Sequence, residues 1–559
     1  MPAEARSVGH LAVGGVAPPL IHLHVTASRI GVKPYGEKPS VIGSGSGRHS
    51  LHYNRKATLL TIQRRLALRS LHLLKAAFRK RIMPRRASHV LEPTLRSELY
   101  GAEQMELYGA DLASRHHASQ HVKANTLLTR LADNEAILSR AYEMLTRSLK
   151  DGLRITPAGE WLLDNFYLVE EQIRIAQKHF PKGYSHELTH LRGGPSAGLP
   201  RVYDIALETI CHSDGRVDSE GLRRFVASYQ TVSPLTLGEL WAIPIMLRLA
   251  LIDNLRRIAM RVMTHWRDRK LADEWANIMA DIAERDPKNV VLAVADMARS
   301  DPPMASSFVA ELTRRLQGQG AALALPLTWI EQRLSESGLS VEHLVQLEAQ
   351  QQAADQVSIG NSIGSLRTLS AMNWRDFVES TSSVENTLRE DPAGVHSTMD
   401  FDTRDRYRHV VEAFSKYSGH SETEVARAAV ELARGGVKQG GAQSHVGFYL
   451  VGKGAVTLER NMLVRAPFAQ RLRRLILAAP LEIYLGLIAL LTLLLARPLV
   501  LDIGRNGLHG WLAALIAVPI VLMASQLATS LVNWLATMAL PPEMLPRMDF
   551  SKGVPAEAR

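Results

Sequence analysis

The sequence contains a single cysteine, Cys211, and few aromatic residues, which make up 6% of its 559 residues. One cysteine excludes a disulfide framework within the chain and is typical of a reducing compartment. The sequence also lacks a phosphate-binding glycine loop, a dinucleotide-binding fingerprint and a serine nucleophile elbow. The most familiar nucleotide-binding and hydrolase motifs are therefore excluded. Hydrophobic residues make up 46% of the chain, which is enough to build sizeable buried cores.

Positive charge is in excess, with a formal net charge of +11, but it is unevenly distributed. Residues 1–90 hold sixteen Lys and Arg against only Glu4 and Glu37, a net charge of +14, so the remaining residues carry −3. The basicity belongs to one N-terminal segment, and the body of the protein is nearly neutral. We therefore expect no nucleic-acid partner.

The N-terminal segment, residues 1–90, is predicted to be largely disordered. Residues 1–57 mix Gly, Pro, Ser and His without a helical or strand period. At residues 57–82, leucines alternate with arginines and lysines, which suggests a basic amphipathic helix that could lie on anionic lipid. A solvated helix or a tail without a partner fits this pattern equally well.

The body of the protein is predicted to be helical, which makes the fold class mainly α. Apolar residues recur every three or four positions in a helical domain at residues 91–266 and in a second helical region at residues 267–434. The apolar stretch Trp241–Ile252 is too short to cross a membrane, and we interpret it as a buried core helix. A turn is expected at Gly360–Gly364.

Residues 435–470 are predicted to form a linker between the helical regions and the C-terminal part. Gly435–Gly441 is expected to be flexible because of its glycines. His445–Leu458 alternates apolar and other residues around a Gly-containing turn, which predicts a short β-hairpin.

A two-helix transmembrane hairpin is predicted at residues 471–540, with spans at 475–496 and 511–540. Arginines precede the first span and outnumber those in the connection Arg497–Gly510, so the positive-inside rule places both ends of the hairpin in the cytoplasm. Residues 541–559 are then a cytoplasmic linker. Polar residues in the second span are expected to prefer a protein neighbour over lipid; these are Gln526, Asn533, Ser525 and Ser530.

The sharpest catalytic motif is His186-Glu187-Leu188-Thr189-His190, an H-E-x-x-H sequence. On a helix, this spacing places His186 and His190 on one face for zinc, with Glu187 as general base. Pro181 and Gly193 flank the motif and leave roughly two turns of helix, so we favour a solvated helix with chance histidines.

A run of mixed charge at Met399–Arg408 could bind an anion. The i,i+4 pairs Asp402 with Arg406 and Arg404 with Arg408 are instead typical of a solvated or interface face. We assign no catalytic, cofactor-binding or metal-binding residue in this chain.

Several longer segments closely resemble the N-terminal region of bacterial cyclic β-1,2-glucan synthases. The similarity covers about Leu95 to the end of the chain. It is carried by Thr156–Phe166, Val169–Arg174, Leu199–Tyr203, Arg223–Val226, Pro234–Pro244, Asp391–Val395, Met399–Phe401 and Thr403–Arg408.

The resemblance implies a large inner-membrane enzyme that builds β-1,2-linked glucan from UDP-glucose and closes it into a ring. It implies UDP-glucose and a divalent cation for a transferase domain that follows the first membrane hairpin and is absent here. We therefore expect this truncated chain to be a non-catalytic scaffold and anchor. Its expected partners are the lipid bilayer and a glycosyltransferase domain, in cis or on a separate chain. The expected location is the bacterial inner membrane, multi-pass, with both termini cytoplasmic.

Two alternatives remain open from the sequence. One is a membrane-tethered zinc peptidase that uses His186, Glu187 and His190. The other is a membrane-bound adaptor whose helical hairpins bind other proteins.

Overall fold

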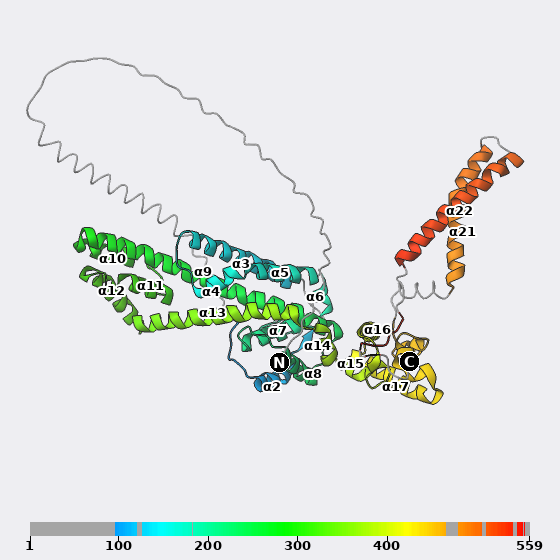
Figure 1. Cartoon of the computed structure of the whole chain (residues 1–559), viewed down its shortest axis with the longest axis horizontal. Coiled ribbons are helices and arrows are strands. Elements are labelled where there is room, and N and C mark those ends of the chain that lie inside the picture. Colours follow the sequence, from blue (N-terminus) through cyan, green and yellow to red (C-terminus); the bar gives the residue numbers. More distant parts are fainter. Residues whose placement is uncertain are drawn as a thin grey trace, which may run out of the picture. The chain divides into compact units, whose positions relative to one another are not determined.

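The computed structural model describes residues 95–119, 126–180, 183–465, 479–505, 510–539, 545–551 and 553. Nearly all regular structure in these residues is helical (Figure 1), and the strands found there are the two-residue β1 (Ala118–Ser119) and β2 (His190–Leu191), which pair antiparallel. The predicted mainly α fold class is confirmed. The predicted disordered segment and the amphipathic helix at 57–82 lie outside the described residues.

The first apolar core gathers around the N-terminal half of the long helix α9 (Leu237–Arg285). The C-terminal half of α13 (Val341–Ala371) completes this core with Ile359, Ile363 and Leu366. The other helices of this region are α2 (Ala102–Arg115), α3 (Thr126–Lys150), α4 (Pro157–Asp164), α5 (Phe166–His179), α6 (Tyr184–Glu187), α7 (Arg201–His212), α8 (Ser219–Val232) and α14 (Trp374–Thr381).

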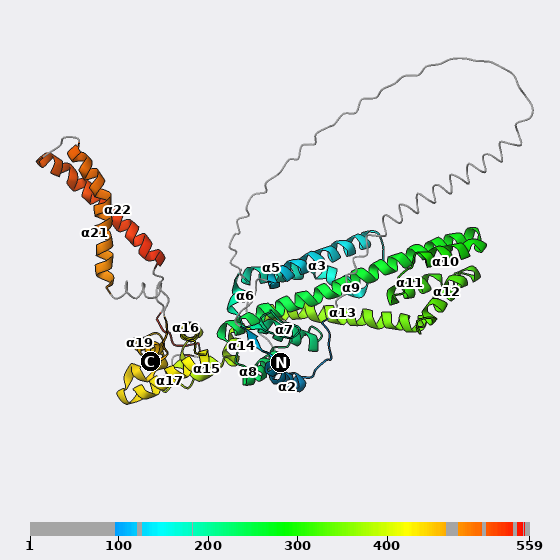
Figure 2. The same ribbon diagram turned by 180° about the vertical axis from the view of Figure 1, so that it is seen from behind.

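A second core joins the C-terminal half of α9, the helices that follow it and the start of α13, and α11 (Ser306–Leu316) lies between the two long helices in Figure 1 and Figure 2. Phe308, Leu312 and Ile330 are among its fully buried residues. Between the two long helices the chain forms η1 (Pro287–Asn289), α10 (Val290–Arg299), α11 (Ser306–Leu316), η2 (Ala321–Leu323) and α12 (Ala324–Ser335).

Helix α9 runs without a break across the boundary predicted at residues 266 and 267. Its start is fixed by Thr236, whose hydroxyl accepts from the Glu239 N–H while the Glu239 carboxylate accepts from the Thr236 N–H. The apolar cores do change near the predicted boundary, because the first core ends on α9 at Met263 and the second begins at Ala272. The stretch Trp241–Ile252 lies in the first core, which confirms its interpretation as a buried helix.

The turn predicted at Gly360–Gly364 is wrong, since α13 continues through both glycines. Two helix-interior glycines cost about 2 kcal/mol in helix propensity. Tertiary packing offsets this cost, because Ser365 receives the Val217 N–H and donates to the Gly215 carbonyl, each at 2.8 Å. A side chain on Gly215 would lie 2.6 Å from the Ser362 hydroxyl. Small residues therefore let α13 approach the α7–α8 turn closely.

A third core is formed by the helices that follow α14. Tyr407, Val411, Val430 and Leu458 are among its buried residues. The elements are α15 (Ser383–Leu388), η3 (His396–Thr398), α16 (Phe401–Ser418), α17 (Glu422–Gly436), η4 (Val437–Gln439), η5 (Gly441–Ser444), α18 (Val446–Leu450) and α19 (Ala455–Asn461).

The β-hairpin predicted at His445–Leu458 is wrong, because these residues form α18 and most of α19. Val446, Leu450 and Leu458 are buried on helix faces, and the Asp391 carboxylate fixes the start of α18 by accepting from the Val446 N–H at 3.0 Å. Gly435–Gly441 is not an open linker either. Gly436 is buried so closely against the Gln443 backbone that a side chain would have no room.

The C-terminal helices are α21 (Pro480–Arg505) and α22 (Trp511–Ala539). Both contain a stretch that is long and apolar enough to cross a membrane, Pro480–Ile503 and Trp511–Met538. Most of the connection predicted at Arg497–Gly510 is instead helical, since α21 continues to Arg505. Pro480 occupies the first turn, where a missing N–H leaves no helical bond unmade.

Candidate functional site: the membrane hairpin and its attachment

The two C-terminal helices have the composition of lipid-facing helices. The candidate spans have mean hydropathies of 2.1 and 2.0, and only 6% and 11% of their residues are buried. Large apolar side chains such as Leu493, Leu515 and Leu522 are exposed. A soluble protein rarely exposes so much contiguous apolar surface, so the bilayer is the solvent that suits this hairpin.

Helices α21 and α22 pack against each other through small residues and one polar contact. Ala524, Ala528 and Val532 are buried at the helix pair, and the Tyr484 hydroxyl donates to the Asn533 amide oxygen at 2.8 Å. Close approach through small side chains and an interhelical hydrogen bond are typical of membrane helix pairs. Asn533 therefore has the protein neighbour that its polarity predicts.

The other polar residues of the second span differ from one another. The Ser525 and Ser530 hydroxyls donate to the carbonyls of Leu522 and Gln526 in their own helix, which satisfies them without a partner. The Gln526 side chain is exposed and makes no hydrogen bond within residues 479–505 and 510–539 or the other described residues. Its expected protein neighbour stays a prediction.

The chain that leads into the hairpin is fixed to the C-terminal end of α16. After α19, Leu463 adopts a left-handed conformation with φ of 52°, which turns the chain. The Arg465 N–H then donates to the Tyr417 carbonyl at 2.9 Å. This contact also satisfies a carbonyl of the last helical turn, which has no partner within the helix.

The chain that leaves the hairpin is fixed to the N-terminal end of α16. The Asp400 N–H donates to the Arg547 carbonyl at 3.0 Å, and the Asp549 N–H donates to the Thr398 carbonyl at 2.9 Å. The Arg547 N–H donates to the Thr403 hydroxyl at 3.0 Å. Residues 545–551, which we call the return strap, therefore pair with the backbone just before α16 and with its first turn. Both ends of the hairpin are attached to one helix.

Buried ion pairs hold α16 in place. Arg408 is fully buried and donates to Glu385 at 2.7 Å and to Asp405 at 3.0 Å, while Arg404 donates to Glu379 at 2.6 Å. Burial would raise the pKa of Glu385, but hydrogen bonds and positive charge from His396 and Arg408 outweigh it and lower the pKa to about 2. This carboxylate therefore stays ionised inside the third core.

The mixed-charge run is thus an internal interface rather than a solvated face. Arg404 pairs with Glu379 of α14, and Arg408 pairs with Glu385 of α15 as well as with Asp405 of its own helix. Asp402 lies 3.8 Å from Arg375. The sequence pattern could not reveal Glu379 and Glu385 as the partners, because they are more than twenty residues away along the chain.

A further contact joins the third core to α9. The Leu237 N–H at the start of α9 donates to the Glu422 carboxylate at 2.9 Å, and Trp241 packs edge to face on Phe401. Burial raises the pKa of Glu422 to about 7, with a further upward contribution from the carboxylates Glu412 and Glu239 that is included in this value and an opposing one from the Leu237 N–H. The buried carboxyl group therefore titrates near neutral pH.

The H-E-x-x-H motif does not lie on one helix. Helix α6 ends at Glu187, and His190 belongs to strand β2, where its Nδ1 lies 2.8 Å from the Leu188 carbonyl oxygen. His186 and His190 are therefore not one helical turn apart on the same helix, which is the arrangement that would present both imidazoles to zinc. The described residues contain no group of three or more His, Cys, Asp and Glu that could hold a metal ion.

Two of the segments that carry the family resemblance meet in space. The Arg201 guanidinium donates to the Glu239 carboxylate at 2.7 Å and to the Ser233 hydroxyl at 2.8 Å, and all three residues are shielded from solvent or nearly so. Arg201 belongs to Leu199–Tyr203 and Glu239 to Pro234–Pro244. These contacts join the start of α7 to the start of α9 within the first core.

No protein-family model matches the chain. The chain is 29% identical over 472 residues to the cyclic beta-(1,2)-glucan synthase NdvB of Rhizobium meliloti (strain 1021). The alignment covers 83% of this chain and 16% of the relative, so the chain spans only a small part of the length of the protein it matches. The resemblance to cyclic glucan synthases inferred from the sequence is confirmed.

Proposed function

We propose that this chain is a non-catalytic helical scaffold and membrane anchor for the synthesis of cyclic β-1,2-glucan from UDP-glucose. The similarity to a cyclic glucan synthase over 83% of the chain supports the assignment to this process. The charged clusters of the described residues support a structural role, because Arg201 and Arg408 are committed to buried carboxylates. The glucosyl transfer is then the work of a transferase domain, in cis or on a separate polypeptide, with UDP-glucose and a divalent cation.

The observation that carries this proposal is the attachment of both hairpin ends to α16. The hydrogen bonds that join Arg465 and Arg547 to the two ends of α16 support an even number of bilayer crossings between these residues. The two spans therefore lead out and back, and whatever follows the return strap begins on the side of the helical body. A transferase on that side would share the compartment of the scaffold.

The compartment that suits this arrangement is the cytoplasm of a bacterial cell, with the hairpin in the inner membrane. Arg471, Arg473 and Arg474 precede the first span, and positive charge near a span favours the cytoplasmic face. UDP-glucose is a cytoplasmic nucleotide sugar, which agrees with this orientation.

The proposal is tested by a glucan synthesis assay on purified protein with UDP-glucose and Mg²⁺. We expect no β-1,2-glucan from this chain alone. We expect membranes that hold a separate transferase polypeptide to bind this chain, and to gain glucan synthesis when it is added. Glucan formation by the purified chain alone would contradict the non-catalytic assignment.

A further inference from the structure

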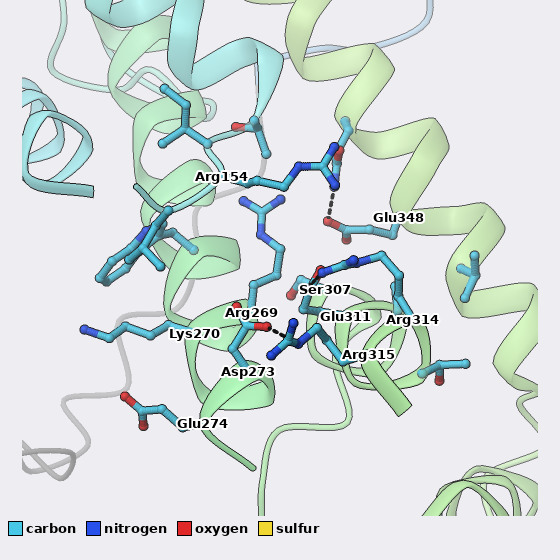
Figure 3. Close-up of a pocket in the computed structure, with 18 of the residues that line it drawn as sticks. Arg154, Arg269, Lys270, Asp273, Glu274, Ser307, Glu311, Arg314, Arg315 and Glu348 are labelled. Atoms are coloured by element: carbon cyan, nitrogen blue, oxygen red, sulfur yellow. Dashed lines mark hydrogen bonds and ion pairs between the residues drawn. The ribbon is translucent and has the colours of Figure 1, made fainter. Parts of the chain in front are cut away.

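A cavity of about 890 Å³ opens between the two long helices, away from the membrane hairpin's attachment to α16. Its walls come from the α3–α4 loop, from α9, from α11 and from α13. Figure 3 shows the charged side chains that line it. Five are cationic, namely Arg154, Arg269, Lys270, Arg314 and Arg315, and four are acidic, namely Asp273, Glu274, Glu311 and Glu348.

The acidic residues that face the cavity already have partners. Glu311 pairs with Arg314 on the same helix, and Asp273 accepts from Arg315 at 3.2 Å. Glu348 accepts from the Ser306 hydroxyl and from the Gln352 amide, each at 2.8 Å. These carboxylates are therefore committed to groups of the protein, and their charge is largely compensated locally.

Arg154 and Arg269 differ from the other arginines of the cavity. Neither guanidinium donates a hydrogen bond or forms an ion pair within 4 Å anywhere in the described residues. Figure 3 shows both side chains at the same end of the cavity, whereas Lys270 and Glu274 point away from it. Two like charges therefore face one space without a carboxylate in direct contact.

The surroundings make this arrangement unfavourable unless an anion is present. Burial lowers the pKa of Arg269 and outweighs the more distant carboxylates Glu348, Glu311 and Asp273, while the positive charge of Arg154 lowers it further. The half-buried guanidinium of Arg269 has five N–H donors but neither a counter-ion nor a hydrogen-bond acceptor within reach. A tetrahedral oxyanion would supply both.

We propose that this cavity binds a phosphate-bearing anion, held between the guanidinium groups of Arg154 and Arg269. Guanidinium groups suit phosphate because two parallel N–H donors match two phosphate oxygens. Arg314 and Arg315 also line the cavity, but they pair with Glu311 and Asp273, so Arg154 and Arg269 are the two arginines left for the anion.

The test is isothermal titration calorimetry of the full chain in detergent with sodium pyrophosphate, at constant ionic strength. We expect saturable binding that weakens about ten-fold or more in Arg154→Gln and in Arg269→Gln. Arg154 is exposed, so its replacement is expected to leave the fold intact, and its variant tests the site even if Arg269→Gln folds poorly. Arg299→Gln, which changes an exposed arginine on α10, is the matched control and should bind like the parent chain.

A second titration identifies the source of the phosphate. Dihexanoyl phosphatidate that binds with the same dependence on Arg154 assigns the site to a lipid headgroup. Pyrophosphate binding without phosphatidate binding assigns it to a soluble ligand, and either result supports the proposal. The absence of pyrophosphate and phosphatidate binding, or equal affinities in the parent chain and Arg154→Gln, would overturn it.

Discussion

The backbone N–H of Asp400 donates to the carbonyl of Arg547 at 3.0 Å, across a sequence separation that contains the whole membrane hairpin. Asp400 is also the N-cap of α16, where its side chain accepts from the Thr403 N–H. The residue that starts α16 thus also receives the chain as it returns from the second span. This double role makes the first turn of α16 the fastening point of the return strap.

Loss of the Thr403 hydroxyl should loosen the return strap. Thr403→Val removes the acceptor of the Arg547 N–H and leaves the helix otherwise intact, at a cost of about 1 kcal/mol. We expect faster hydrogen exchange at the amides of Arg547 and Asp549, measured by mass spectrometry. Thr368→Val, on the exposed face of α13, is the control and should leave these amides unchanged.

Removal of the Arg408 charge should destabilise the third core strongly. Arg408→Met leaves Glu385 buried without its nearest cation, and we expect a loss of about 3–5 kcal/mol in the free energy of unfolding at pH 7. Arg434→Met removes an exposed ion pair with Glu390 and should cost less than about 1 kcal/mol. Chemical denaturation followed by circular dichroism measures both.

The same pair predicts how the defect depends on pH. The pKa of Glu385 in the folded state is about 2, below its usual 4.5, so its stabilising effect is fully present above pH 4.5 and is lost as the pH falls towards 2. The difference between Arg408→Met and the parent chain should shrink over this range. A difference that is constant from pH 7 to pH 3 would contradict the ionic explanation.

Glu422 should make the chain less stable as the pH rises. Its folded-state pKa of about 7 lies above the usual 4.5, so the folded state binds the proton more tightly and stability falls between about pH 4.5 and pH 7. Glu422→Gln keeps an acceptor for the Leu237 N–H without a charge. We expect it to raise stability by up to about 3 kcal/mol at pH 8 and to have little effect at pH 4.

Thermal unfolding of the detergent-solubilised chain at the two pH values measures this effect. The exposed Glu431 lies on the same helix, and Glu431→Gln should change stability by less than about 0.5 kcal/mol at either pH. Equal stabilisation by Glu422→Gln at pH 4 and pH 8 would show that titration is not its cause.

The contact between Tyr484 and Asn533 should couple the two spans. A double-mutant cycle with Tyr484→Phe and Asn533→Leu is expected to give a coupling energy of about 0.5–2 kcal/mol in detergent unfolding experiments. Gln526→Leu changes another polar residue of the same span, whose side chain is exposed and makes no hydrogen bond in the described residues. Its cycle with Tyr484→Phe should give no coupling.

The features that were predicted correctly from the sequence are those that local residue patterns determine. The apolar period of the body, the buried nature of Trp241–Ile252 and the two spans all follow from residue order along one segment. The predicted turn at Gly360–Gly364 and the β-hairpin at His445–Leu458 were wrong, because contacts with Gly215 and Asp391, distant in the chain, determine those conformations.

The attachment site was harder to predict for the same reason. Thr398, Asp400 and Thr403 are ordinary residues at a helix start, and nothing in their order indicates that the return strap pairs with them across the membrane hairpin. The partners of Arg404 and Arg408 were likewise hidden, since they lie on α14 and α15. The family resemblance singled out Met399–Phe401 and Thr403–Arg408 but did not indicate which residues they contact.

The most direct test of the proposed topology is cysteine labelling in sealed vesicles. Cys211→Ala provides a cysteine-free chain, into which one cysteine is placed at Ser397 on the helical body, at Ser551 in the return strap or at His509 between the spans. In inside-out vesicles, a membrane-impermeant maleimide should label positions 397 and 551 directly and position 509 only after permeabilisation. Labelling of 397 and 551 from opposite sides of the membrane would contradict the out-and-back hairpin.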